Sequence, residues 1–333
     1  MFTFERHQEI CEIGGVKIGG QPGENPTFMM GSMFYSGHKK VLESERDRKK
    51  AKFNKDKAEE LINKLETLSD ETGIPVGLDL VANYSQEASR YIDFVTSVTD
   101  MPFSTDIWNL KPKLGAARYV AEQNLQDRHI YNSLAPWSTD IRLEVETIRE
   151  LKLKNVILVA FNSKDPSIAG KLGILRKDLL PWAREAGFKN CLIDTSLMSV
   201  PSSAFAFLAG KLVKEELGLP VGCAPSNGSD MVKRKTERQF QKQGFIALDS
   251  AVHALAALMW QDYLLFGPVE SAPWLLPAVA TVDSMLPAFV WEERHALPSD
   301  PGHPLHRFYS DFVDTLLGKK EIRGDMKPPK EDE

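Results

Sequence analysis

Residues 155–161 read Asn-Val-Ile-Leu-Val-Ala-Phe, a β-branched and apolar run that predicts a strand buried on both faces. A helical pattern that begins at Asp140 precedes this run. The same unit, a short apolar strand followed by an amphipathic helix, recurs along the chain. The other predicted strands are 28–34, 74–82, 103–108, 130–134, 191–193, 221–224 and 263–269, with helices beginning near Ser85, Pro112 and Pro201, after residue 224, and over 245–262. The chain therefore contains eight strand–helix units.

This alternation predicts an α/β fold with parallel strands and helical crossovers. Eight units favour a closed (β/α)₈ TIM barrel over an open sheet. The 333 residues exceed the roughly 250 of a plain barrel, and the surplus predicts an N-terminal β-hairpin around Gly14-Gly15 and an extra C-terminal helical segment. The expected division is 1–25 for a hairpin capping the barrel, 26–293 for the barrel, 294–318 for the helical extension and 319–333 for a charged tail.

The composition favours a globular protein of a reducing compartment. Hydrophobic residues make up 42% and charged residues 26%, and the net charge of −5 argues against a nucleic-acid partner. Three scattered cysteines form no CxxC pair. The N-terminus has no signal-peptide pattern, and no run of about 18 apolar residues indicates a membrane span. We expect a cytoplasmic location.

Several kinds of catalytic or binding motif are missing. The glycine-rich segment 14–20 lacks the Lys-Ser/Thr of a phosphate loop. There is no GxSxG or HExxH motif, and the seven histidines do not combine with the cysteines at zinc spacing. We therefore expect no metal bound by this chain.

Polar residues follow or end the predicted strands, where the active sites of barrel enzymes lie. Each could be only a helix cap or a loop hydrogen bonder. Together, with few basic residues among them, they favour a neutral heterocycle rich in donors, such as a pterin, whose amino group and ring N–H one carboxylate can accept. They are Asp79, Asp106, Asn109, Asn132, Ser133, Asn162, Asp194, Thr195, Ser226 and Asn227.

The segment 13–27, Ile-Gly-Gly-Val-Lys-Ile-Gly-Gly-Gln-Pro-Gly-Glu-Asn-Pro-Thr, followed by Gly-Ser-Met-Phe-Tyr at 31–35, resembles the start of the tetrahydromethanopterin S-methyltransferase H-subunit family. The likeness continues more loosely through 68–73 and 141–151. The resemblance implies a pterin-binding barrel that transfers a methyl group. Within this group the chain is most similar to the soluble members of glycine-betaine demethylation systems, which serve one-carbon metabolism. That similarity implies methyl transfer from a methyl-Co(III) corrinoid protein to N5 of tetrahydrofolate.

The resemblance also implies the site residues. Asp106, Asn132, Ser133, Asp194, Ser226 and Asn227 match the group's pterin-binding positions, whereas Asp79 and Asn162 are second-tier candidates. Relatives often have proline after the aspartate at 194, where this chain has Thr195. Asn227 and Asp194 are the expected catalytic residues beside N5. Because no general base of matched pKa is evident, water is the expected final proton carrier.

The corrinoid (cobalamin type) is expected on a partner protein, since the chain has no DxHxxG sequence. The basic run 46–57, with seven basic and two acidic residues, is either a solvated helix start or part of the docking surface. The apolar segments 274–291 and 303–317 favour a homodimer. The alternative functions are an H-subunit-like tetrahydromethanopterin methyltransferase of a larger complex, a barrel that makes dihydropteroate, and a non-catalytic pterin-binding or scaffold barrel.

Overall fold

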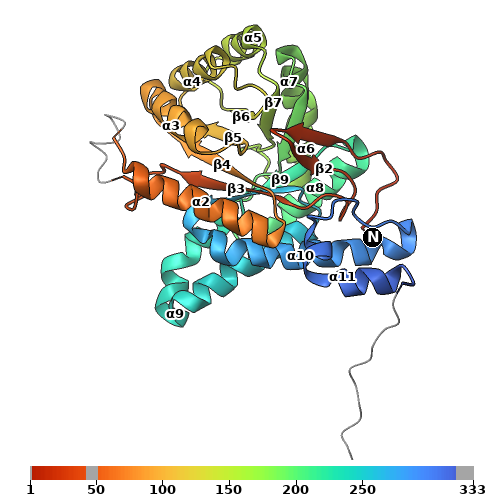
Figure 1. Ribbon diagram of the computed structural model, residues 1–333. Coiled ribbons are helices and arrows are strands. Elements are labelled where there is room, and N and C mark those ends of the chain that lie inside the picture. Colours follow the sequence, from red (N-terminus) through yellow and green to blue (C-terminus); the bar gives the residue numbers. More distant parts are fainter. Residues whose placement is uncertain (1, 43–51, 320–333) are drawn as a thin grey trace, which may run out of the picture.

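A computed structural model of the chain describes residues 2–42 and 52–319. Eight parallel strands form a closed barrel in the order β10-β3-β4-β5-β6-β7-β8-β9, so the predicted (β/α)₈ TIM barrel is confirmed (Figure 1). Every predicted strand is present: β3 (Phe28–Met33), β4 (Val76–Val81), β5 (Phe103–Asp106), β6 (His129–Leu134), β7 (Asn155–Val159), β8 (Asn190–Asp194), β9 (Val221–Cys223) and β10 (Tyr263–Pro268).

Helices cover the outside of the barrel. They are α2 (Lys55–Thr72), α3 (Ser85–Val98), α4 (Leu110–Glu122), α5 (Ile141–Leu151), α6 (Ile168–Ile174), α7 (Leu180–Ala186), α8 (Ser203–Leu217), α9 (Pro225–Leu258) and α10 (Ala272–Arg294). The last helix, α11 (Pro304–Leu316), packs on α10. Short π and 3₁₀ segments, Leu175–Leu179 and Val269–Ser271, precede α7 and α10. The separate helices predicted after residue 224 and over 245–262 are the two halves of α9, which is kinked at Gln241 (φ 62°) and ends at Leu258.

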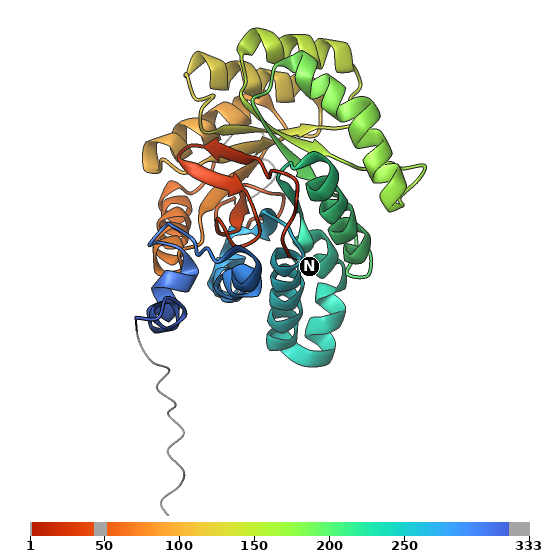
Figure 2. The same cartoon turned by 90° about the vertical axis from the view of Figure 1, so that its right-hand side faces the viewer.

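The predicted N-terminal hairpin, β1 (Ile10–Ile13) and β2 (Val16–Gly19), lies across the end of the barrel where the strands begin (Figure 2). Its Ile13 and Ile18 pack on the lower barrel interior, including Phe28 and Tyr263. Asn190, the first residue of β8, donates its side-chain N–H to the carbonyl of Glu12 at 3.1 Å. The hairpin therefore closes the N-terminal end and leaves the opposite end for ligands.

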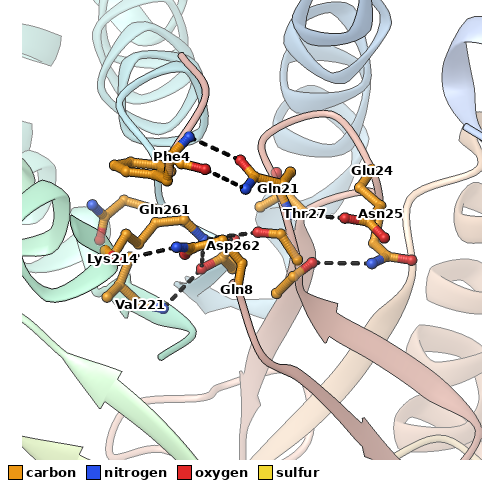
Figure 3. Close-up of polar contacts among 12 residues, drawn as sticks. Phe4, Gln8, Gln21, Glu24, Asn25, Thr27, Lys214, Val221, Gln261 and Asp262 are labelled. Atoms are coloured by element: carbon orange, nitrogen blue, oxygen red, sulfur yellow. Dashed lines mark hydrogen bonds and ion pairs between the residues drawn. The ribbon is translucent and has the colours of Figure 1, made fainter. Parts of the chain in front are cut away.

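A buried ion pair anchors the segment that follows the hairpin (Figure 3). Lys214 Nζ lies 2.7 and 2.8 Å from the two carboxylate oxygens of Asp262 and also donates to the carbonyl of Gly20. A Cβ on Gly19 would lie 2.5 Å from the carbonyl oxygen of Glu9, and its φ of 102° favours glycine. The glycine-rich motif thus has a structural role at the closed end of the barrel.

One helical stretch among the described residues, Val269–Arg294, is long and apolar enough to cross a membrane by length and composition. In its most apolar window 56% of the residues are buried in the protein, and α10 packs on α9, α11 and α2. It is thus a wall helix of the barrel. Residues 46–51 of the basic run and 320–333 of the charged tail lie outside the described part of the chain.

Candidate active site

The open end of the barrel contains a buried carboxylate with three side-chain donors. Asp79 is 4% exposed. Its Oδ2 accepts from Ser32 Oγ at 3.1 Å, and its Oδ1 accepts from Asn132 Nδ2 at 3.1 Å and from Ser104 Oγ. The strand register explains the cluster, because Asp79 pairs with Ser32 on one side and Ser104 on the other. Burial raises the pKa of Asp79, while these three hydrogen bonds lower it.

Asp106 lies one layer nearer the open end. It is two residues after Ser104, and alternate residues of a strand face the same side, so its carboxylate also points into the barrel. Its side chain is exposed at the mouth, and no hydrogen bond from a described residue occupies it. Although Asp106 keeps access to solvent at the mouth, desolvation by the surrounding barrel wall, and then the charge of Asp79, raise its pKa to about 7, opposed by Lys113. Asp106 is therefore the carboxylate available to a ligand.

The hydrogen bond to Asp79 fixes the amide of Asn132, which neighbours Asp106 in the β5–β6 register. Because Nδ2 donates to Asp79, the amide oxygen is free to accept from a ligand. The backbone carbonyl of Ser133 accepts from Lys113 Nζ at 2.9 Å. Asn132 and Asp106 thus form one acceptor surface.

Asp194 ends β8 and faces the same interior, because Leu192, two residues earlier, packs in the barrel core. It is 8% exposed, and its Oδ1 accepts from the backbone N–H of Ser196 at 2.7 Å. Burial raises the pKa of Asp194 to about 6, opposed by this hydrogen bond and by Lys171. Thr195 donates its hydroxyl to the carbonyl of Gly222, so the residue that replaces a proline of relatives has a partner in the barrel wall.

Ser226 and Asn227 begin α9 directly after β9. Ser226 is buried, and its hydroxyl donates to the carbonyl of Leu265 at 3.2 Å. Asn227 is exposed, and among the described residues its amide group makes one long contact, 3.4 Å, to the carbonyl of Leu197. Its side chain can therefore turn toward a ligand.

The structure does not bring Asn162 into this set. Its side-chain oxygen accepts from the backbone N–H groups of Lys164 and Asp165, an ordinary turn after β7. The expectation of a mouth almost free of basic residues also needs correction. Lys113 reaches it from α4, paired with Glu144 at 2.6 Å, and Lys171 from α6 donates to the carbonyls of Thr195 and Ser196. Sequence reasoning missed both lysines because they lie on helices rather than at strand ends.

Two other hollows lie away from this site. A cleft of about 420 Å³ beside Gly15, Asp70 and Arg307 is at the closed end of the barrel. An apolar groove of about 540 Å³ runs between α10 and α11 and includes Met285, Phe289 and Phe312. Within residues 2–42 and 52–319, no group of three His, Cys, Asp or Glu side chains could hold a metal ion.

Comparison with known proteins reveals a family of methyltransferases. The family model described as tetrahydromethanopterin S-methyltransferase MtrH subunit matches residues 6–294. The tetrahydromethanopterin S-methyltransferase H subunit of Methanopyrus kandleri is 37% identical over 84% of this chain and 91% of its own length. The protein of that name from Methanothermobacter thermautotrophicus is 33% identical, over 92% and 99%.

Solved structures agree on the fold. The dihydropteroate synthase of Yersinia pestis superimposes with a TM-score of 0.55 at 13% identity, covering 83% of this chain and 98% of its own. The Xanthomonas albilineans enzyme gives 0.54 at 17% identity, covering 88% and 100%. At these identities the likeness extends to the barrel architecture only.

Proposed function

Since the chain belongs to the family of tetrahydromethanopterin S-methyltransferase MtrH subunits, we propose that it transfers a methyl group between N5 of a tetrahydropterin and a corrinoid held by a partner protein. The observation that carries this proposal is the acceptor surface of Asp106 and Asn132, which faces the open end of the barrel. A pterin has the matching edge, with adjacent amino and ring N–H donors.

In this proposal Asp106 accepts the two donors in parallel, and the oriented amide oxygen of Asn132 accepts a third. Asp79 holds Asn132 in that orientation and does not touch the ring. The effect of these residues is positional: they hold N5 in line with the methyl carbon.

Asn227 and Asp194 lie on the β8–β9 side and act at N5. The amide of Asn227 accepts from N5–H or donates to unprotonated N5, so it tolerates both protonation states. Asp194 supports the proton affinity of that region through its charge.

The names of the relatives favour tetrahydromethanopterin as the pterin, ahead of the tetrahydrofolate expected from the resemblance to soluble members. These relatives are named as subunits, which favours assembly with other chains. We further propose that the protein acts in the cytoplasm and that the corrinoid protein docks on it. The apolar α10–α11 groove is the proposed contact of a homodimer. A dihydropteroate-forming reaction is disfavoured, since Lys113 and Lys171, which would have to bind pyrophosphate, are already engaged.

The test is anaerobic. Purified protein is mixed with free methylcobalamin and either tetrahydromethanopterin or tetrahydrofolate, and loss of the methyl-Co(III) absorption is followed. Turnover with one pterin establishes reaction and pterin class together. Pterin binding by calorimetry without turnover would indicate that the partner is required, whereas absence of both binding and turnover would refute the proposal.

A further inference from the structure

A second cluster of titratable side chains lies at the open end of the barrel, beyond the ends of β3 and β10. Tyr35 donates its hydroxyl to Glu270 Oε2 at 3.2 Å. His38 Nε2 lies 3.3 Å from Glu270 Oε1, and the His38 ring stacks on Tyr35 with centroids 4.5 Å apart and planes 6° apart. His38 is fully buried, while the Glu270 side chain keeps 20% of its surface in solvent. The roles proposed so far do not use these three residues.

The backbone determines which nitrogen of His38 carries the proton. The N–H of Phe34 donates to His38 Nδ1 at 3.2 Å, so Nδ1 is the acceptor of a neutral ring. The ring proton then lies on Nε2 and faces Glu270. Glu270 thus has the Nε2 of His38 3.3 Å from one oxygen and accepts a hydrogen bond from Tyr35 at the other.

The loop that presents Tyr35 has an uncommon conformation. Phe34 has φ 59°, a region that bulky residues seldom adopt. It is fully buried, with its ring 3.8 Å from that of Tyr91, centroid to centroid, and nearly parallel to it. Such strain persists where the surrounding packing holds it, and it is concentrated at functional sites.

Tyr35 lies on the Asn227 side of the mouth. The carboxylate of Asp230 is close enough to perturb its phenol, and Asp230 follows Asn227 by three residues on α9, so the two share one helix face. Ser32, three residues before Tyr35, pairs with Pro268 of β10, two residues before Glu270. In the proposed binding mode Asp106 holds the amino edge of the pterin, so the opposite edge, which includes N5, would lie toward this side of the mouth.

On the basis of the proposed function, we propose that Tyr35 and Glu270 form the proton relay for N5, with His38 as a positioning residue. As N5 bonds to the methyl carbon, the cobalt–carbon bond breaks and its electron pair stays on cobalt. The N5 proton passes to the Tyr35 oxygen while the phenolic proton of Tyr35 passes to the Glu270 carboxylate. The partly exposed Glu270 then releases the proton to water. The reverse transfer uses the same path to protonate N5, without which the methylated amine is a poor leaving group.

The charges around the cluster are consistent with this direction. Burial raises the pKa of Tyr35, and Glu270 and Asp230 raise it further, so the phenol stays neutral and can only pass a proton on. Burial would raise the pKa of Glu270, but the neighbouring N–H of His38 and the charge of Lys40 lower it overall, so the carboxylate is ionised and can accept a proton. A second basic side chain near Glu270 is Lys64, which lines the same small hollow.

The experiment compares Tyr35→Phe and Glu270→Gln with wild type, using free methylcobalamin and the accepted pterin, and methylpterin with cob(I)alamin for the reverse. Tyr119→Phe is the matched control, because Tyr119 also donates its hydroxyl to a carboxylate, Asp93, but on the outer helices α3 and α4. Unfolding midpoints identify variants that have lost their fold, and calorimetry gives the pterin Kd.

We expect both variants to lower kcat at least ~100-fold, the usual contribution of a proton-transfer group, with Kd nearly unchanged. In the reverse direction the wild-type rate should rise as pH falls through the titration of Glu270, and Glu270→Gln should lose that limb. Wild-type kcat and pH profile in both variants would overturn the relay while leaving the proposed function intact. A wild-type protein that neither binds pterin nor transfers methyl would refute both.

Discussion

Asp79 Oδ1 and Asn132 Nδ2 are 3.1 Å apart, and this hydrogen bond crosses from β4 to β6 over the intervening strand β5. A carboxylate deep in the barrel therefore determines which end of an amide faces the mouth. The candidate pterin site thus has two layers. The inner one, Asp79 with its donors, is saturated, whereas the outer one, Asp106 with the Asn132 oxygen, is free to bind.

The inner layer predicts a combined effect on stability and binding. Asp79→Ala leaves the buried side chains of Ser104 and Asn132, and the half-buried Ser32, without their acceptor. The cost is roughly 1–3 kcal/mol for each buried group that finds no other partner. We expect the free energy of unfolding to fall by at least about 2 kcal/mol and the pterin Kd to rise about tenfold, because the Asn132 amide can then turn. Denaturant titration and calorimetry measure the two effects. Ser32→Ala, which removes one donor only, is the control, and an unchanged Kd in Asp79→Ala would contradict the positioning role.

The outer layer and Asn227 are predicted to act on different kinetic parameters. Asp106→Ala should mainly weaken pterin binding, because it removes a contact made equally in the ground and transition states. Asn227→Ala should lower kcat with a modest change in Kd, because its contact matters as N5 changes charge. Steady-state kinetics with calorimetry separate the two, and equal effects of both variants on both parameters would contradict the division.

Pterin affinity should depend on pH through Asp106. The pKa of its carboxyl is raised to about 7, first by desolvation and then by Asp79. The carboxylate form accepts the pterin donors, so affinity should be full above pH 7 and should fall as pH decreases through it, approaching about tenfold per unit. Calorimetry at several pH values measures this limb. Asp106→Asn should abolish this pH dependence, whereas Asp194→Asn should retain it because Asp106 is still present. A pH dependence that persists in Asp106→Asn would exclude this assignment.

The closed end of the barrel predicts a purely structural phenotype. Lys214→Met leaves Asp262 buried without its cation, and breaking such a pair costs about 3–5 kcal/mol. Pterin Kd should be unchanged in the protein that remains folded, because the pair lies at the opposite end from Asp106. Thermal unfolding checks the first expectation and calorimetry the second. Lys214→Met/Asp262→Asn should recover part of the loss, and a double variant as unstable as the single one would argue against the ion pair as the cause.

The order and type of the elements were determined by local sequence. Strands such as Asn155–Val159 and their helices could be predicted because β-branched runs and helical periodicity act over short distances, and eight such units favour one closed arrangement. The same pattern was enough to propose candidate site residues, because the carboxyl ends of the strands meet at one end of a parallel barrel. These are Asp106, Asn132, Asp194 and Asn227.

Which of these side chains are saturated and which are free to contact a ligand depends on the folded barrel. The register β3–β4–β5 brings Ser32 and Ser104 to Asp79 and so makes it an inner, saturated carboxylate, whereas Asn162 turns back to cap its own loop. No local sequence pattern predicts that Lys113 and Lys171 reach the mouth. Nor does one predict the contact of Tyr35 with Glu270, which lie 235 residues apart in the chain. The contact of Tyr35 with Glu270 follows from barrel closure, which places β10 beside β3. The two lysines reach the mouth from helices α4 and α6, and the energetics of burial and pairing at such contacts arise only after the chain has folded.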